Sequence, residues 1–291
     1  MDKSRDYWLD KYLSNITSQG GEDGLIEKIF AKIGEGNNWC VEFGAWDGKR
    51  YSNTFNLLNN KNWKGILIET NKKKYKELLS NYRNNPNVYS VNKYVSYEGE
   101  NSLDNILSKY DIPFDFDLLS IDIDGNDYHV WDSLINYQPK LVIIEFNQTI
   151  PNDVEFVQKK DFKINHGSSI LAMVNLARKK EYELIYSTST NLFFVKKIFY
   201  ERLDIKNNEI DFIKPPESTP RLFQLYDGTL VITQGFKLIW SPRIIVNQYE
   251  FQVIPKYARG LPDNNKMLFK NIVRNIYLIT RIIYQKFKRN Y

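Results

Sequence analysis

Short apolar runs alternate with amphipathic stretches between about residues 39 and 196. Apolar runs separated by segments with helical spacing are typical of a parallel sheet that helices cover on both faces. The pattern predicts strands at 39–43, 65–69, 88–91, 116–121 and 141–146, and helices at 52–59, 72–82, from Ser102 onward, 128–135 and 169–180. The fold class is therefore predicted to be α/β.

Two further apolar runs, at 182–186 and 191–195, are joined by the short polar turn 187–190. Strands this close in sequence pair as an antiparallel hairpin. A hairpin that closes an otherwise parallel sheet is typical of class I methyltransferases, whereas simple dinucleotide-binding domains usually continue in parallel. We therefore expect a Rossmann-like class I methyltransferase sheet, mostly parallel, within a domain at 1–200.

The pattern changes after residue 200. Alternating runs at 229–232 and 236–240 lie among several prolines and predict a small β-rich appendage at 201–264. The tail at 265–291 predicts a basic amphipathic helix, with apolar residues at three- and four-residue spacing and seven Lys or Arg but no Asp or Glu after Asp263. Two roles stay open for this helix: peripheral contact with the inner face of an anionic membrane, or packing on the domain or on a dimer partner.

Composition and charge narrow the classes of function. The net charge of +5 is too small to indicate nucleic acid binding, and we expect no nucleic acid partner. The single cysteine, Cys40, excludes a disulfide framework and a zinc site built from several cysteines. The charged N-terminus has no apolar run, and no uncharged apolar stretch is long enough to cross a bilayer, so a cytoplasmic location is expected.

The end of the first predicted strand carries the first chemical signal. Gly44 ends this strand and Gly48 follows, and glycines here let a backbone approach a ligand at the carboxyl edge of the sheet. Glu42 suits the ammonium group of a methionine, directly or through water, and would repel a phosphate. The glycine spacing also differs from G-x-G-x-x-G, which disfavours a dinucleotide. A plain strand-turn with a glycine that packs a helix is the alternative.

The residue at the end of the second predicted strand indicates a binding site for the adenosine part of a cofactor. Glu69 is placed to accept hydrogen bonds from both ribose hydroxyls. NAD and S-adenosylmethionine both contain such a ribose, so Glu69 does not distinguish between them. Val95 and Ser96 follow the third strand, where they are expected to contact the adenine. The switch point of the sheet should lie beside the first strand, and ligands bind there in open α/β sheets.

Acidic residues end the fourth and fifth predicted strands, so Asp122, Asp124, Glu145 and Asn147 should converge in the same crevice. A carboxylate here could be the general base for a hydroxyl, or oxygen ligands from Asp122, Glu145 and Asn147 could bind Mg²⁺. A purely structural cluster of acids is the alternative. His166 is a further candidate base, or an ordinary loop histidine.

Several motifs together resemble the FkbM-type methyltransferases, which use S-adenosylmethionine and mostly O-methylate sugars and other hydroxylated natural products. The resemblance covers about 15–196 and implies that 41–48 cradles the cofactor. The matching segments are 18–23, 41–48, 68–69, 119–127, 143–147 and 168–180. The residues expected to bind the cofactor are Gln19, Glu42, Phe43, Gly44, Ala45, Asp47, Glu69, Val95, Ser96 and Asp122, and those expected to act in catalysis are Asp122, Asp124 and His166.

The acidic loop departs from the family pattern Asp-x-Glu-Gly-x-Glu, because it reads Asp122-Ile-Asp124-Gly125-Asn126-Asp127. The change approaches the Asp-x-Asp pattern of metal-dependent sugar O-methyltransferases and favours Mg²⁺. The leading hypothesis is an O-methyltransferase that acts on a sugar or glycan hydroxyl. An NAD-dependent sugar-modifying enzyme and a non-catalytic Rossmann scaffold are the alternatives. The 19–23 segment is expected to fold over the cofactor or to order the first helix.

Overall fold

A computed structural model describes residues 7–215 and, beyond them, 222–225, 229–232, 236–238, 241–246, 251–252, 254–256, 259, 272–273, 275–280 and 283. The chain forms two compact units, Met1–Pro216 and Glu217–Tyr291. The first unit includes residues 201–215, which the sequence pattern assigned to the appendage. Leu203 and Ile213 tie this segment to the first unit, because each is buried in one of its apolar clusters.

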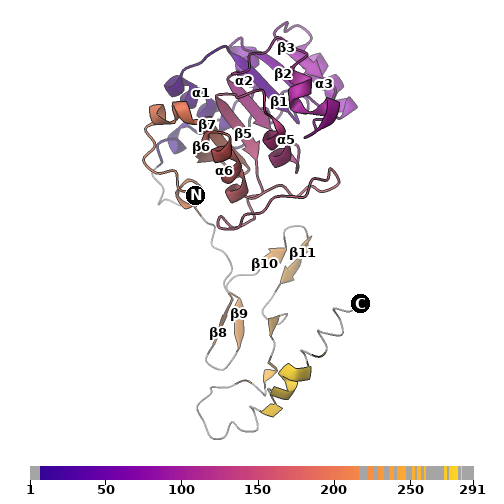
Figure 1. The fold of residues 1–291 in the computed structure, drawn as a ribbon, viewed down its shortest axis with the longest axis vertical. Helices are drawn as coiled ribbons and strands as arrows, with labels where there is room; N and C mark the ends of the chain where they lie inside the picture. Colours follow the sequence, from indigo (N-terminus) through magenta and orange to yellow (C-terminus); the bar gives the residue numbers. More distant parts are fainter. Residues whose placement is uncertain are drawn as a thin grey trace. The chain divides into compact units, whose positions relative to one another are not determined.

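The first unit is built on a seven-stranded sheet with the order β3-β2-β1-β4-β5-β7-β6 (Figure 1). Strands β1 to β5 pair in parallel, and β7 runs antiparallel to both β5 and β6. This topology confirms the predicted Rossmann-like sheet, and its order reverses between β1 and β4, beside the first strand as expected. The strands are β1 (Trp39–Phe43), β2 (Lys64–Ile68), β3 (Val88–Val91), β4 (Leu118–Ile121), β5 (Leu141–Glu145), β6 (Tyr182–Ser187) and β7 (Asn191–Lys196).

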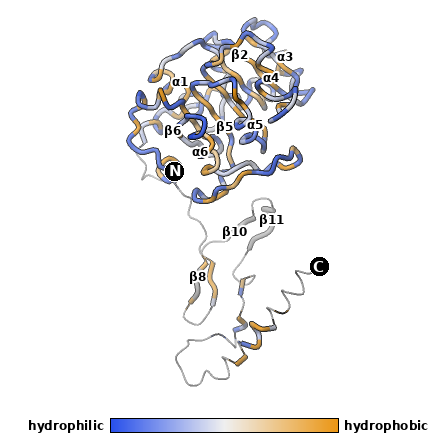
Figure 2. The backbone as a smooth tube through the Cα atoms, viewed as in Figure 1, coloured by the Kyte–Doolittle hydropathy of each residue, from blue (hydrophilic) through white to orange (hydrophobic). Residues whose placement is uncertain are grey.

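Helices bury both faces of this sheet, which explains the near-continuous apolar strands. One apolar cluster joins β1 to α4, α5 and α6 through residues such as Val41 and Trp131, and the other joins β1 to α1, α2 and α3 through residues such as Cys40 and Leu57. Figure 2 shows hydrophobic segments gathered inside this unit. The helices are α1 (Glu22–Ile33), α2 (Phe55–Asn60), α3 (Lys72–Tyr82), α4 (Leu103–Leu107), α5 (Asp127–Ser133), α6 (Ile170–Lys179), α7 (Lys197–Tyr200) and α8 (Ile210–Ile213), with 3-10 turns at Asp10–Tyr12, Gly99–Asn101 and Glu201–Leu203.

Polar side chains start three of these helices. Asn71 accepts hydrogen bonds from the backbone N–H groups of Lys73 and Lys74 at the start of α3. Ser102 caps α4 with its hydroxyl, and Ser169 caps α6 in the same way. Each cap satisfies amide groups that have no partner within the first helical turn. The predicted helices at 72–82 and 169–180 are confirmed to within one residue.

The second unit contains two antiparallel pairs of strands within its described residues. Strand β8 (Leu222–Gln224) pairs with β9 (Leu230–Ile232), and β10 (Phe236–Leu238) pairs with β11 (Ser241–Val246). Residues 272–273, 275–280 and 283 are helical and belong to the segment where the sequence predicts an amphipathic helix, and the rest of 265–291 lies outside the described residues. Among the described residues, no helix has the length and apolar character needed to cross a bilayer.

Candidate active site

The turn after β1 is held against the residue that follows β4. Gly44 has a φ of +74°, and a Cβ added there would lie 1.6 Å from the backbone oxygen of Asp122. A glycine is therefore required on two grounds, the left-handed backbone and the close approach of the chain. This contact brings the end of β1 and the acidic loop together at the switch point of the sheet, where the sequence placed the cofactor.

Glu42 is buried on β1 and is already engaged by the segment that precedes α2. Its Oε2 accepts hydrogen bonds from the hydroxyls of Ser52 at 2.6 Å and Thr54 at 2.7 Å, and its Oε1 accepts one from the Asn53 N–H at 2.9 Å. Burial raises the pKa of Glu42, and these hydrogen bonds partly offset the effect. A methionine ammonium would have to share this carboxylate, so fixing the 52–54 segment is the role of Glu42 that its contacts establish.

Glu69 follows β2, and its carboxylate binds the backbone of the glycine turn. Its Oε2 accepts a hydrogen bond from the Trp46 N–H at 2.8 Å, and its Oε1 accepts one from the Asn71 N–H at 2.6 Å. A carboxylate oxygen has two lone pairs, so each oxygen keeps one for a further donor. Two neighbouring hydroxyls of a ribose are donors of this kind, and the geometry fits the predicted contact.

A cavity of about 140 Å³ lies beside Glu69 at the carboxyl edge of the sheet. It brings together the predicted residues Gly44, Glu69 and Val95. Ser96 is not part of its wall, because its N–H donates to the Asn101 carbonyl and its hydroxyl accepts from the Glu98 N–H in a buried turn. The cavity is lined by Gly44, Ile68, Glu69, Thr70, Lys93, Tyr94, Val95, Ile123 and Phe162.

Phe162, which no sequence pattern indicated, reaches this cavity from the segment between β5 and α6. That segment is about 70 residues further along the chain than Val95, and no periodicity connects the two. Ile123 was also missed as a lining residue. Its position between two conspicuous acids, directly after a strand end, was the available signal.

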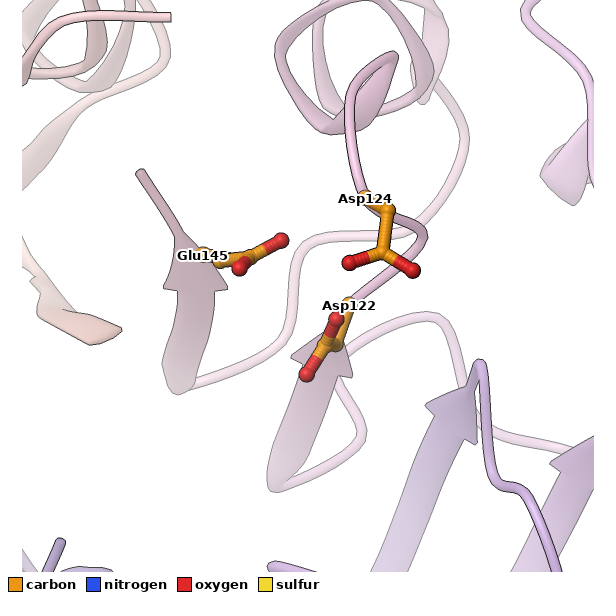
Figure 3. A group of neighbouring side chains, drawn as sticks. All are labelled: Asp122, Asp124 and Glu145. Carbon is orange, nitrogen blue, oxygen red and sulfur yellow. The ribbon is translucent and has the colours of Figure 1, made fainter. Parts of the chain in front are cut away.

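Three carboxylates gather at the ends of β4 and β5 (Figure 3). One oxygen from each of Asp122, Asp124 and Glu145 lies within 4.8 Å of the others. Glu145 points from the end of β5 toward the loop that holds Asp122 and Asp124. Asp127, buried at the start of α5, shapes this loop by accepting hydrogen bonds from the N–H groups of Ile123 and Gly125, each at 2.8 Å. The predicted convergence of the strand-end acids is thereby observed.

The acidic side chains lie close enough to raise one another's pKa values. Solvent reaches Asp122 through the cleft, but the surrounding protein and the negative charges of Asp127, Asp124 and Glu42 raise the pKa of Asp122 to about 7. Burial and the negative charges of Asp122, Asp127 and Asp124 raise the pKa of Glu145 to about 9, with Asp122 the largest contributor among the three. Carboxylates this close cannot all ionise at neutral pH without a counter-charge. The site therefore holds protons or attracts a cation.

A second cavity, of about 430 Å³, opens over these acids. Asp124, Glu145 and His166 all face it, so the structure brings the predicted base His166 to the acidic group. Most of the residues that line it are polar, and Phe146 is the only large apolar residue among them. The lining residues are Asp124, Glu145, Phe146, Asn147, Gln148, Thr149, Asn165, His166, Gly167 and Thr190.

Asn147 lines this cavity but is poorly placed as a metal ligand. Its Oδ1 accepts hydrogen bonds from both the N–H and the hydroxyl of Thr149, and its Nδ2 donates to the His166 carbonyl at 2.6 Å. Of the predicted ligands Asp122, Glu145 and Asn147, the two carboxylates lie close together, and the carboxylate of Asp124 joins them as a third candidate ligand.

Four predicted cofactor contacts have other roles in the structure. The side chains of Phe43 and Ala45 are buried in the apolar clusters on the two faces of the sheet. Asp47 accepts hydrogen bonds from the N–H groups of Lys49 and Arg50 in the turn that follows. Gln19 is exposed, and its carbonyl accepts a hydrogen bond from the Asn15 side chain. Within residues 43–47, Gly44 is the residue that lines the cavity beside Glu69.

The segment before α1 orders the helix. The Oδ2 of Asp23 accepts hydrogen bonds from the N–H groups of Ile16, Thr17 and Ser18. Glu22, fully buried, accepts hydrogen bonds from side chains of the β6–β7 hairpin, at Thr188 and Asn191. Of the two predicted roles for residues 19–23, these contacts establish the ordering of the first helix.

No family model and no curated protein matches this sequence. Its fold is similar to that of the CMeT domain of the citrinin polyketide synthase, with 9% identity and a TM-score of 0.42 over 61% of this chain and 51% of that one. It is also similar to the N-terminal domain of EvdMO1 with SAH bound (9% identity, TM-score 0.40, 65% and 84% covered). A third similar structure is an S-adenosylmethionine-dependent methyltransferase from Clostridium acetobutylicum (10% identity, TM-score 0.38, 60% and 89% covered). These are likenesses of fold, and a functional assignment has to come from the site.

Proposed function

We propose that this protein is an S-adenosylmethionine-dependent O-methyltransferase. The observation that carries the proposal is the wall between the two cavities. Ile123 lines the cavity beside Glu69, and its neighbour Asp124 lines the cavity over the acids. An adenosine bound at Glu69 would therefore lie next to a polar compartment large enough for an acceptor. Two adjoining compartments at the switch point of an open α/β sheet suit the transfer of a group from a cofactor to a second substrate.

The chemistry is a direct displacement at the methyl carbon of the sulfonium. The acceptor oxygen forms a bond to the methyl carbon, the bond from carbon to sulfur breaks, and the electron pair of that bond stays on sulfur. The hydroxyl proton passes to a base. Asp122, whose pKa is raised to about 7 and whose carboxylate lies close to those of Asp124 and Glu145, is the base we assign. Alignment of the two reactants supplies most of the remaining rate enhancement.

A sugar hydroxyl is the acceptor that fits the second cavity best. Its wall presents amide and hydroxyl groups from Asn147, Gln148, Thr149, Asn165 and Thr190. Groups of this kind can both donate and accept hydrogen bonds, as a polyhydroxylated ligand requires. A glycan or a related glycoconjugate is therefore the proposed substrate class. Mass spectrometry of cell glycans with and without the gene should reveal the loss of one CH₂ increment per modified residue, and unchanged glycans would argue against this class.

Activation of the acceptor by Mg²⁺ is the alternative to base catalysis by Asp122, because a carboxylate that coordinates the ion is no longer available as the base. The oxygens of Asp122, Asp124 and Glu145 are the ligand type that Mg²⁺ prefers, and the raised pKa values of Asp122 and Glu145 reflect a need for positive charge among them. A bound divalent ion would lower the pKa of the acceptor hydroxyl and orient it. Activity that survives exhaustive treatment with EDTA and does not rise on addition of MgCl₂ would remove the metal from the proposal.

Calorimetric titration of the full chain is the first test of the methyltransferase proposal. S-adenosylmethionine and S-adenosylhomocysteine should bind, and NAD should not. Glu69→Ala should abolish binding, whereas Glu77→Ala, at a partly exposed acid on α3 that pairs with Lys74, serves as the control and should bind normally. Absence of binding at millimolar cofactor would refute the proposal. Binding of NAD alone would favour the sugar-modifying dehydrogenase, and normal binding by Glu69→Ala would favour a scaffold.

The C-terminal helix supports a separate proposal, that this segment contacts an anionic membrane surface. Within its described residues Ile272, Ile276, Ile279 and Ile283 are about half exposed and recur at helical spacing. The sequence from 264 onward adds seven positive charges and no negative one. Together these features suit a helix that lies in the headgroup region. Co-sedimentation with anionic liposomes should require residues 264–291, and equal pelleting of a chain that ends at Asp263 would contradict the proposal.

A further inference from the structure

The segment between β5 and α6, residues 148–168, is docked on the acidic loop. Gly125 makes room for it, since a Cβ there would lie 2.8 Å from the Ile164 carbonyl oxygen and 3.1 Å from both amide atoms of Gln158. The Asn126 side chain donates a hydrogen bond to the Asp161 carbonyl at 3.1 Å. The acidic motif thus includes a docking surface for this segment, which explains why a glycine and an amide stand between its acids.

Gln158 fastens the segment internally. It is 1% exposed, and its Oε1 accepts hydrogen bonds from the N–H groups of His166 at 2.7 Å and Gly167 at 2.8 Å. Its Nε2 donates to the Ile164 carbonyl at 2.8 Å, and its own carbonyl lies 2.5 Å from the Nε2 of His129 on α5. One buried side chain therefore sets the position of both His166, which faces the acidic cavity, and the stretch that contains Phe162.

Phe162 stands at the edge of the cavity beside Glu69, supported by other aromatic rings. Its ring stacks on Tyr97, with centroids 5.1 Å apart and planes within 4°, and meets Tyr94 edge-on at 4.8 Å. Phe162 is still 37% exposed, so part of the ring is available to a ligand. The other apolar residues of this cavity, Ile68, Val95 and Ile123, give it the apolar character that suits a flat heteroaromatic ring.

We propose that Phe162 is a cofactor-binding residue that packs against the adenine, and that Gln158 is a positioning residue that holds Phe162 and His166 in place together. The inference rests on the proposed function, since it requires an adenosine at Glu69. Stacking on an aromatic side chain strengthens the binding of a base substantially and does not depend on hydrogen-bond pattern. Gln158 therefore positions one residue in each compartment, Phe162 beside the cofactor and His166 beside the acceptor.

The test is calorimetry with S-adenosylhomocysteine and with 5′-methylthioadenosine, which lacks the amino-acid part. Phe162→Ala should weaken both ligands by the same factor, about tenfold or more. The matched control is Phe156→Ala, because Phe156 belongs to the same segment, is also 37% exposed and does not line the cavity. Its binding should equal that of the wild type, and Phe162→Leu should fall between the wild type and Phe162→Ala.

The outcomes separate the two proposals. Wild-type protein that binds neither ligand refutes the methyltransferase and this inference together. Wild-type binding with an unchanged Phe162→Ala refutes the inference alone, and so does a loss confined to S-adenosylhomocysteine, because the ring would then contact the amino-acid part. If Gln158 acts by holding Phe162, the double variant with Gln158→Ala and Phe162→Ala should bind no more weakly than the weaker single variant. Fully additive losses would overturn the positioning role.

Discussion

Replacing Gly44 by alanine tests the contact between the glycine turn and the acidic loop. The added Cβ would lie 1.6 Å from the Asp122 oxygen, and real Cβ contacts do not fall below 3.0 Å, so the two segments would have to separate by at least 1.4 Å. The Asp122 N–H donates to the Phe43 carbonyl at 3.3 Å, and this hydrogen bond would not survive the movement.

The magnitude has two parts. A left-handed backbone costs an alanine about 1–2 kcal/mol, and overpacking against a fixed neighbour costs about 1–3 kcal/mol more. Gly99→Ala isolates the first part, because Gly99 has a φ of +70° and no atom within 4 Å of an added Cβ. We expect a loss of unfolding free energy of about 1 kcal/mol for Gly99→Ala and about 2–5 kcal/mol for Gly44→Ala.

Urea unfolding followed by tryptophan fluorescence is the assay, because five of the six tryptophans belong to the first compact unit. Calorimetric titration with S-adenosylmethionine provides the second measurement, in which Gly44→Ala should not bind and Gly99→Ala should bind like the wild type. If Gly44→Ala lost no more stability than Gly99→Ala, the turn could separate from Asp122 without cost, and the steric reasoning would be wrong.

Three further predictions concern buried or clustered groups. Glu69→Gln should weaken S-adenosylmethionine binding about 10- to 100-fold in calorimetry, because it removes a charge-assisted acceptor, and unchanged affinity would exclude a ribose contact. The folded protein favours protonated Asp122 and Glu145, whose pKa values rise to about 7 and 9 from an unfolded value of about 4. The contribution of these two groups to the unfolding free energy, measured in urea, should therefore be highest near pH 4 and should fall as the pH rises to 9. Asp122→Asn should flatten this fall, and an equally steep slope in that variant would contradict the assignment. Cys40 is fully buried and burial raises the pKa of its thiol, so Ellman's reagent should react with it only after unfolding, and rapid reaction of the native protein would contradict that burial.

Much of the sheet follows from local patterns. Strand β1 and helix α3 occupy the predicted ranges, because a buried strand must be apolar and a surface helix must present one apolar stripe. Helix α1 had no predicted range, although Leu25, Ile29 and Ile33 follow helical spacing. Its start depends on Asp23 and Glu22, whose partners include Asn191 of β7.

The sequence by itself determined which residues end neighbouring strands, and therefore that Gly44, Glu69, Asp122 and Glu145 share one edge of the sheet. Carboxyl ends of parallel strands meet at one edge, so this inference needs only the strand pattern. Only the tertiary structure decided which of the side chains at this edge face the site and which pack into the core. It assigned Phe43 and Ala45 to the core and brought Asp124 close to the candidate ligands Asp122 and Glu145. The structure also brought the 148–168 segment onto the acidic loop. Contacts of this kind join residues far apart in sequence through hydrogen bonds and packing, and no local pattern encodes them.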